Sequence, residues 1–422
     1  MSGVIIACSI FFRAESYDLE ALRSRWHRLV VARFPLAEHA GRLLLLGDHT
    51  HVVKDGGRMP GVVSLRESSE TQSKPGYFRG QCWGAVGILT KPLSACFCLP
   101  LSLQLHQGFQ HLGQAAASLS LGERVVQMAL DFACRQDRPA LMVLDAFFST
   151  GPVFRLAMSV WSIRLKQPYL QIITRAKKNY VAYLPPRPKP PGKRGRPRTY
   201  GDKVHLWEVF DHGGTLFEEV EMTVYGKTET VRLAAAALVW RPLGQPLQFV
   251  WAITSRGPIV LMSSDLTLKP CFILEAYCHR VRVEVLFDTL KNVIGAFRFH
   301  FWSKHLPRHS RKPVSNQRLK APAPEHLEKV ARCWLAMEMF VFCATVATGL
   351  LQGFALSYRQ GIWKRQVLYL RTRSRELPSE RTVRQVLAPI MARHLLQSCP
   401  KSLFGKIREA VNGDEDDEPL IG

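Results

Sequence analysis

Four polar residues late in the chain are spaced so that one α-helix would carry them on a single face: Tyr277, Arg280, Glu284 and Lys291. They lie at offsets of three, seven and fourteen residues from the tyrosine. At about 100° per residue, these offsets place the side chains within a stripe roughly 60° wide. Cations and a hydroxyl suit phosphate oxygens, and a carboxylate suits a metal ion. The spacing alone also fits a solvated face with charge pairs four residues apart.

Two aspartates stand just after short, continuous apolar runs. Leucines at 43–46 precede Gly47 and Asp48, and the apolar residues 141–144 precede Asp145. Such runs predict buried strands, and in open sheets the working site lies outside strand ends. We therefore expect both aspartates at one edge of a sheet. Considered alone, each aspartate is explained equally well in two ways: as a metal ligand, and as a turn or cap residue at the end of a strand.

The spacing Tyr277-x2-Arg280-x3-Glu284-x6-Lys291 resembles the Y-R-E-K signature of bacterial insertion-sequence transposases that have an RNase H-like DDE catalytic domain. The run Trp251-Ala-Ile-Thr254-Ser255 is similar to the strand that precedes the signature helix in that family. The resemblance spans roughly residues 43–291. In relatives an aromatic residue commonly follows the motif arginine, whereas Val281 stands here.

This resemblance implies that Asp48, Asp145 and Glu284 are the three catalytic carboxylates and that they hold two Mg²⁺ or Mn²⁺ ions. Two such ions about 4 Å apart activate a water or a 3′-hydroxyl and stabilise the leaving oxygen, and they prefer hard oxygen ligands. Three clustered acids without a cation would repel one another. We therefore expect metal binding to stabilise the protein.

The resemblance also implies that Tyr277, Arg280 and Lys291 hold DNA phosphates near the bond that is cut. Ordinary surface pairing is the alternative for these three side chains.

Trp251 is similar to a tryptophan that stacks on a base flipped out of the duplex, and a core tryptophan in a strand explains it nearly as well. On the adjoining face of the helix, four apolar residues are expected to contact the sheet: Leu274, Cys278, Val281 and Val285.

The charge balance predicts a polyanionic partner. The chain has 57 Lys and Arg against 34 Asp and Glu, a formal net charge of +23, which exceeds what solubility requires. A proline-rich and glycine-rich basic loop contains a Gly-Arg-Pro core like that of an AT-hook, with cations at Arg194, Arg196 and Arg198. Insertion into an A·T-rich minor groove and plain phosphate attraction both remain open for this loop. Residues 304–320 form a second basic loop.

We expect no membrane span. The longest apolar stretch, residues 339–351, is shorter than the roughly 20 residues that a spanning helix needs, so a buried core helix is the better interpretation. The apolar segment 4–12 has no preceding basic residue and makes a poor secretory signal. A cytoplasmic protein, associated with the nucleoid when bound to DNA, is expected. The ten cysteines have no paired metal-ligand spacing and are expected to be structural thiols.

The order of elements predicts an α/β fold: an RNase H-like mixed sheet flanked by helices, with an inserted β-meander and a helical C-terminal region. Residues 1–40 are expected to form a short N-terminal helical segment. Residues 41–300 form the catalytic domain with a basic loop and β-strand insertion at 185–255, and 301–422 comprise a basic loop, helices and an acidic tail. Relatives place a DNA-binding domain before the first aspartate. Either this region is truncated here, or end recognition lies in the insertion and the C-terminal helices.

These observations predict a Mg²⁺-dependent DNA transposase that cleaves and transfers strands at insertion-sequence ends. Its partner would be double-stranded DNA, both element ends and target, bound by a homodimer. The alternative is a catalytically inactive or truncated transposase-derived protein that binds DNA without cutting it.

Overall fold

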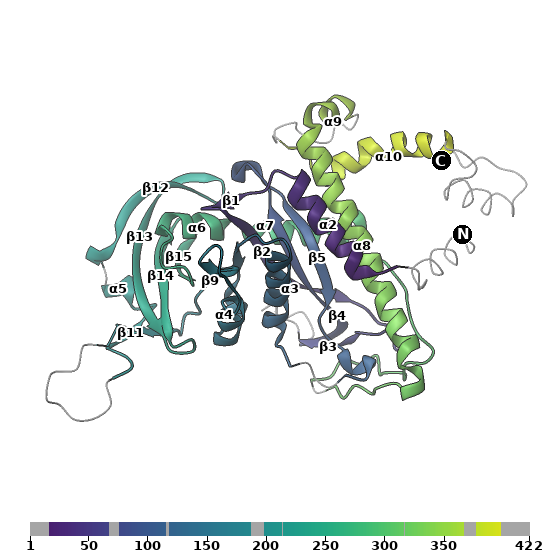
Figure 1. Ribbon diagram of the computed structural model, residues 1–422, viewed down its shortest axis with the longest axis horizontal. Helices are drawn as coiled ribbons and strands as arrows, with labels where there is room; N and C mark the ends of the chain where they lie inside the picture. The colour runs from purple at the N-terminus through teal and green to yellow at the C-terminus, as the bar shows by residue number, and fades with distance from the viewer. Residues whose placement is uncertain are drawn as a thin grey trace, which may run out of the picture.

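The sheet that runs through the molecule is mixed, and helices flank both of its faces (Figure 1). The structure is a computed structural model. It describes residues 17–66, 76–114, 118–186, 198–212, 214–315, 317–366 and 377–397. Within these residues the main sheet has 13 strands in the path β11-β10-β13-β14-β15-β9-β6-β2-β4-β3, with β1, β12 and β5 attached to its members. The expected α/β class with a helical C-terminal region is confirmed.

Five strands form the centre of this sheet, in the order β5-β4-β2-β6-β9. β2 pairs antiparallel with β4, and β4 pairs antiparallel with β5. β6 lies parallel to β2, and β9 lies parallel to β6. The bounds are β2 Arg42–Val53, β4 Tyr77–Leu89, β5 Cys98–Leu105, β6 Ala140–Leu144 and β9 Leu170–Arg175.

Short strands complete the first half of the chain. β1 pairs with β2, β3 pairs with β4, and β7 and β8 form a separate two-stranded ribbon. Their bounds are β1 Glu38–His39, β3 Val63–Arg66, β7 Trp161–Ser162 and β8 Gln167–Pro168. Three 3-10 turns lie between the strands: η1 Leu93–Ala95, η2 Phe109–Leu112 and η3 Ala146–Phe148.

An antiparallel meander follows β9 and extends the same sheet. β12, β13, β14 and β15 pair in succession, and β15 pairs with β9. The bounds are β10 Val181–Tyr183, β11 Lys203–His205, β12 Glu218–Val224, β13 Lys227–Trp240, β14 Gln245–Thr254 and β15 Gly257–Ser263. The composition of residues 206–225 predicts a strand, but residues 206–212 and 214–217 form none. Residues 206–208 form a turn, helix α5 (Val209–His212) follows, and the 3-10 turn η4 (Gly214–Leu216) precedes β12. Phe210 of α5 packs edge-on against Trp207 of the turn.

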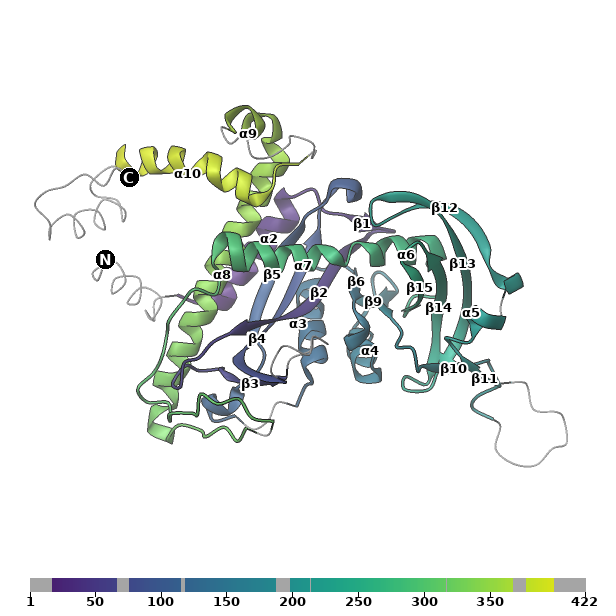
Figure 2. The same cartoon turned by 180° about the vertical axis from the view of Figure 1, so that it is seen from behind.

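Alternating burial explains the continuous apolar runs. α2 (Leu19–Arg33), α3 (Leu121–Arg135) and α4 (Gly151–Ala157) cover one face of the sheet, and α6 (Pro270–Cys278) and α7 (Val281–Asp288) cover the other (Figures 1 and 2). Successive strand residues point to opposite faces. Leu43 and Leu45 accordingly pack in the core with α3, whereas Leu44 and Leu46 pack in the core with α7.

The helix expected from Cys271 onward is interrupted twice. α6 ends at Cys278, α7 begins at Val281, and a π-helical segment, η5 (Thr289–Ile294), follows directly. Between α6 and α7 the amides of Arg280 and Val283 donate to carbonyls three residues back, which tightens the turn. The tight turn changes the helical phase, so the expected apolar face is wrong in its second half. Leu274 and Cys278 are buried, but Val281 and Val285 are exposed, and Val283, Leu286 and Leu290 are buried in their place.

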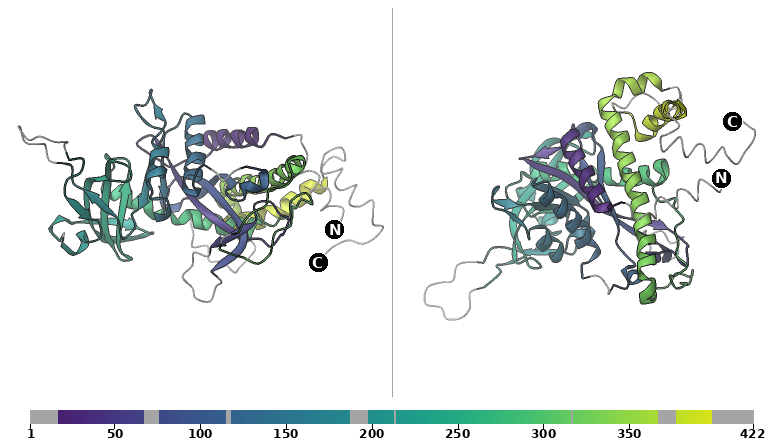
Figure 3. Two further views of the ribbon diagram at one scale, coloured as in Figure 1. Left: turned by 90° about the horizontal axis from the view of Figure 1, so that it is seen from below. Right: turned by 45° about the vertical axis from the view of Figure 1, so that its right-hand side comes forward.

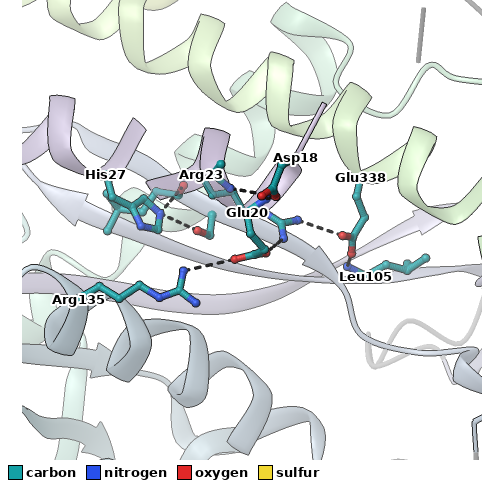
Figure 4. A network of polar contacts seen from close by, with 10 residues as sticks. Asp18, Glu20, Arg23, His27, Leu105, Arg135 and Glu338 are labelled. Atoms are coloured by element: carbon teal, nitrogen blue, oxygen red, sulfur yellow. Dashed lines mark hydrogen bonds and ion pairs between the residues drawn. The ribbon is translucent and has the colours of Figure 1, made fainter. Parts of the chain in front are cut away.

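The N-terminal helix α2 is held on the sheet by polar contacts as well as by apolar packing (Figure 4). Arg23, which is 5% exposed, donates to Glu20 and to Glu338 of α8. Glu338 also accepts the amide of Leu105 in β5 at 3.2 Å, and Arg135 of α3 pairs with Glu20 at 3.3 Å. This helix is therefore part of the same packed body as the sheet.

The C-terminal region is helical within the described residues. It comprises η6 (Pro324–His326), α8 (Leu327–Ser357), α9 (Arg359–Arg365) and α10 (Glu380–Gln397). Figure 3 shows α9 and α10 beyond one end of α8, at the end of the molecule opposite the meander. By length and composition residues 324–357 could cross a membrane, which by itself is weak evidence. α8 packs against β5, and its side chains Val330, Ala336, Met337 and Val341 are fully buried, as in a core helix.

The eight described cysteines are all free, which agrees with the expectation of thiols. Cys82, Cys96, Cys98, Cys278 and Cys333 are buried. Cys343 differs from the expectation for an apolar stretch, because it lies on the exposed side of α8.

Candidate active site

Asp48 and Asp145 lie side by side on neighbouring parallel strands. The pairing of β2 with β6 places Leu46 opposite Val143, so the same register continued by two residues places Asp48 opposite Asp145. The prediction that Asp48 stands at a strand end is wrong. β2 continues to Val53 because β4 pairs with it throughout that length, and only its parallel neighbour β6 stops at Leu144. Asp48 therefore lies inside β2, next to the point where the neighbouring strand β6 ends.

Both aspartates are on the face covered by α6 and α7. Asp48 is in phase with Leu44 and Leu46, and Asp145 is in phase with Leu141 and Val143; all four apolar residues belong to the core on that face. His49, the next residue, is on the opposite face, where its ring stacks on Phe148 with centroids 5.5 Å apart. Strand alternation thus directs the two carboxylates toward the helix that carries Glu284.

Arg280 connects the first aspartate with the glutamate. Its Nη1 donates to Asp48 Oδ2 at 3.2 Å, and its Nη2 donates to Oε1 of Glu284, one helical turn further along. The Asp48 side chain is 19% exposed and that of Glu284 is 53% exposed. One guanidinium therefore joins carboxylates that are more than 230 residues apart in sequence, and the cluster is open to solvent on the side of Glu284.

The proton affinity of Asp48 reflects its burial first and its acidic neighbours second. Burial and the neighbouring carboxylate of Asp145 raise the pKa of Asp48 to about 7, although the His49 amide and Arg280 act in the opposite direction. Glu284 also raises this pKa. All three acids are thus close enough to interact, and the single cation does not neutralise them. An additional positive charge would favour the ionised form of Asp48.

Asp145 is fixed by two local contacts. Its carboxylate accepts the amide of Phe147 at 2.8 Å, which starts the turn η3, and its carbonyl accepts the hydroxyl of Thr174 at the end of β9. A short polar side chain that bonds two residues ahead is a common way to leave a strand. The cap role that the sequence left open is therefore present, and it does not remove the carboxylate from the cluster.

Tyr277 and Lys291, the other two residues of the Y-R-E-K spacing, are less exposed than a phosphate-binding role predicts. Lys291, in η5, donates to the carbonyl of His51 at 3.0 Å, and burial lowers its pKa. Tyr277 is 7% exposed, and burial raises its pKa to about 12 against the influence of Arg280 and Arg175. Arg280 and Lys291 both contact β2, at Asp48 and at the carbonyl of His51. The phosphate-binding role of Tyr277 and Lys291 stays a prediction, and it would require both side chains to leave these contacts.

Trp251 is in the core, so the stacking role is wrong for this structure. Its ring is 3% exposed, and its Nε1 donates to the carbonyl of Leu206 at 2.6 Å. It lies in the middle of β14, paired on one side with β13 and on the other with β15. A ring enclosed in this way has no face for a base, which favours the core interpretation that the sequence left open.

Most of the proline-rich and glycine-rich basic loop lies outside the described residues. Arg194 and Arg196 lie outside the described residues. Arg198 is described, and it is exposed in the segment just before β11. Its role as a DNA contact stays a prediction.

The side chains of this cluster are of the kind that binds a divalent ion, but their present positions do not form a metal site. The donors are carboxylate oxygens, which Mg²⁺ and Mn²⁺ prefer. Among the described residues, however, no group of three or more His, Cys, Asp or Glu side chains is placed to hold a metal ion. The guanidinium of Arg280 lies between Asp48 and Glu284 instead. Metal binding by the three acids would require this flexible side chain to move.

Two residues that sequence reasoning missed adjoin the site. Arg175 lies at the end of β9 and is close enough to lower the pKa of Tyr277, and Gly47 precedes Asp48 where a Cβ would meet Val125 of α3 at 2.8 Å. The signal that identified the aspartates, an acid directly after a continuous apolar run, is weaker for Arg175, because Gln171 interrupts the preceding run and Thr174 separates it from the arginine. Nothing local in the sequence marks Gly47, because the contact comes from a distant helix.

Comparison with known proteins gives no assignment: no protein-family model matches this chain, and no curated protein has significant sequence similarity to it.

Proposed function

We propose that this chain is a metal-dependent DNA transposase that cleaves and transfers DNA strands at the ends of an insertion element. The observation that carries the proposal is the grouping of Asp48, Asp145 and Glu284 around Arg280, on one face of the sheet, from three distant parts of the chain. These are the acids that the resemblance to the Y-R-E-K transposases selects.

The order of the central strands supports an RNase H-like catalytic domain. Three consecutive antiparallel strands, β2, β4 and β5, are followed across the sheet by the parallel strands β6 and β9. In this arrangement β2 is central and carries the first acid, Asp48. Its parallel neighbour β6 ends just before the second acid, Asp145. A helix across the same face supplies the third. The meander that follows β9 corresponds to the expected insertion.

Asp48, Asp145 and Glu284 would hold two Mg²⁺ or Mn²⁺ ions, which supply Lewis-acid activation of the attacking oxygen and stabilise the leaving one. The chain's own residues orient the substrate. Arg280 and Lys291 would donate to phosphate oxygens beside the acids once they leave their present contacts with the acids and with the carbonyl of His51. We infer that the protein acts on double-stranded element ends and target DNA as a homodimer, in the cytoplasm and on the nucleoid. The net charge of +23 is consistent with that partner.

The experiment uses the full chain and a supercoiled plasmid that carries the DNA flanking its gene, with Mg²⁺ or Mn²⁺. We expect strand cleavage by the wild type. Asp48→Asn, Asp145→Asn and Glu284→Gln should each lower the cleavage rate by about 10²-fold or more, since each removes a charge that the ions need. Glu325→Gln, which changes an exposed acid in η6, is the matched control and should cut normally.

A second candidate is a DNA-binding protein that retains this fold without catalysis. The observation in its favour is that Arg280 already pairs with two of the acids, so that the described residues hold no ready-made metal site. Salt-sensitive binding of the plasmid without cleavage in either metal would select this candidate and reject the transposase. Cleavage that survives all three substitutions would reject the assignment of the catalytic acids.

A further inference from the structure

An open hollow of about 680 Å³ lies beyond the far end of β2, outside the carboxylate cluster. One wall is the loop 53–59 that joins β2 to β3, and the other is the segment 297–311 that follows η5. We call this hollow the basic groove. In Figure 2 the segment after η5 passes close to β3 at the lower end of the molecule. The amide of Val314 donates to Ser64 of β3, and Gln317 accepts the amide of the same serine.

The two walls are fixed to each other by backbone contacts. His309 N donates to Gly57 O at 2.8 Å, and Ser303 N donates to Arg58 O at 3.1 Å. A Cβ on Gly57 would lie 3.1 Å from the carbonyl oxygen of His309, so the chains approach closely there. Lys54 adds a further link, because its ammonium donates to the carbonyls of Phe297 and Phe299.

Two buried histidines pack against each other where the segment 297–311 meets η2. His309 is 7% exposed and its ring lies 4.8 Å, centroid to centroid, from that of the fully buried His111 in η2. His111 Nδ1 in turn accepts the amide of Gly61 at 3.0 Å. The loops are therefore set in position before any ligand arrives, and a ligand need not spend binding energy on ordering them.

The groove presents more positive than negative charge. Arg58, Arg308 and Arg311 are exposed in its lining, whereas Asp55 is the acid among its lining residues. The pair Arg311–Asp55 is long, at 3.9 Å, with both side chains about two-thirds exposed, so it neutralises little. Trp302, which is 56% exposed, lies at the same surface. Several guanidiniums beside an exposed aromatic ring are typical of a surface that contacts nucleic acid.

The groove lies at the end of the strand that also carries the first acid of the candidate active site. Asp48, His51 and Val53 follow one another in β2, and Lys291 contacts His51 between the two sites. Five residues of strand span about 17 Å at ~3.4 Å per residue. Duplex DNA rises ~3.4 Å per base pair. A duplex lying along β2 would therefore pass from the carboxylates to the groove over about five base pairs.

We propose that the basic groove binds the phosphate backbone of duplex DNA on one side of the cut, about five base pairs from the bond that is broken. The inference rests on the proposed function for the position of the cut. Binding of DNA in the groove does not depend on catalysis.

The test compares two double variants of the full chain. Arg308→Ala with Arg311→Ala removes two cations from the groove, and Arg25→Ala with Arg28→Ala removes two exposed cations from α2, on the opposite face of the sheet. Affinity for a fluorescent duplex is measured by anisotropy over a range of salt concentrations. Each lost phosphate contact lowers the steepness of log K against log salt by about 0.9. We expect a decrease of about 2 for the groove variant and little change for the α2 variant.

Arg308→Lys with Arg311→Lys keeps the charge and should keep the salt dependence, which separates loss of charge from damage to the loop. In the wild type, a neutral methylphosphonate linkage should weaken binding when it lies about five base pairs from the cut, and the alanine variant should be insensitive to it. Equal effects of the groove and α2 variants would overturn the proposal. So would wild-type binding to anionic phospholipid vesicles that DNA cannot displace.

The outcomes also separate this proposal from the previous one. A wild type that binds DNA through the groove but does not cut would reject the transposase and leave the groove as a DNA site. A wild type that cuts, with salt dependence unaffected in the groove variant, would reject the groove and leave the transposase.

Discussion

Asp48 is the residue whose chemistry depends most on its surroundings. It lies in a strand and is largely covered, and it faces Asp145 and Glu284 with one arginine for compensation. Burial and like charge both favour the protonated form, which is why its pKa rises from an ordinary 3.8 to about 7. A carboxyl with a pKa of about 7 is half protonated at neutral pH, so a cation bound nearby would shift it to the ionised form.

This raised pKa makes stability depend on pH. Between about pH 4 and pH 7 the folded chain holds a proton at Asp48 that the unfolded chain has lost, so stability falls as pH rises through that range and stays lower above it. Asp48→Asn removes the charge. We expect the variant to melt several degrees above the wild type at pH 8 without metal, and at nearly the same temperature at pH 5.

Thermal melting followed by fluorescence checks this prediction, with Glu325→Gln as the control that should not shift at either pH. Mg²⁺ should raise the melting temperature of the wild type at pH 8 and have little effect on Asp48→Asn. A variant that melts with the wild type at pH 8 would contradict the account of Asp48.

At the scale of elements, the position of β2 depends on close packing against α3. This helix begins with a complete capping box, in which Ser120 accepts the amide of Glu123 and Glu123 accepts the amide of Ser120. Its Val125 then packs over Gly47. The helix can approach this closely because Gly47 has no side chain, and the next residue along β2 is Asp48. The packing of α3 on one face of the sheet thereby fixes the position of the Asp48 carboxylate on the other face.

Gly47→Ala tests this coupling. The added Cβ would lie 2.2 Å from Met142 Cε and 2.8 Å from Val125 Cγ1. Methionine can move aside, but the branched valine on a helix is stiff. We expect a loss of about 1–3 kcal/mol, seen as a lower melting temperature, together with slower DNA cleavage as β2 is displaced. Gly214→Ala, where a Cβ meets nothing within 4 Å, is the control. Equal melting temperatures for the two variants would show that α3 does not constrain β2.

At the scale of the whole molecule, positive charge is spread over surfaces that different segments supply. The basic groove and the exposed Arg198 near β11 come from separate parts of the sequence. A formal charge of +23 on 422 residues gives a long-range attraction to DNA that salt screens.

We therefore expect duplex binding to weaken steeply with salt. If six to ten phosphates are contacted, affinity should fall by about 10³-fold or more between 50 and 200 mM salt. Anisotropy with duplexes of unrelated sequence measures this directly, and Asp48→Asn should have a slope similar to that of the wild type. A slope near zero would contradict DNA as the partner of the basic surfaces.

Much of the fold class and part of the site followed from local sequence patterns. The leucines at 43–46 and the apolar residues at 141–144 predicted buried strands, since an uninterrupted apolar run is typical of a strand covered on both faces. The spacing of Tyr277, Arg280, Glu284 and Lys291 predicted a single helical face, but the helix is interrupted and Tyr277 is buried. The strand predictions succeeded because the apolar character of a whole segment reports directly whether that segment is covered.

The tertiary structure alone decided which segments meet. The register that sets Asp48 opposite Asp145 depends on the pairing of β2 with β6, and the burial of Trp251 depends on strands on both sides of it. The tight turn at Arg280 displaced the apolar face of the helix, and the basic groove joins loops about 240 residues apart. Contacts between distant segments are fixed by packing and backbone pairing throughout the fold, and local residue patterns contain no record of them.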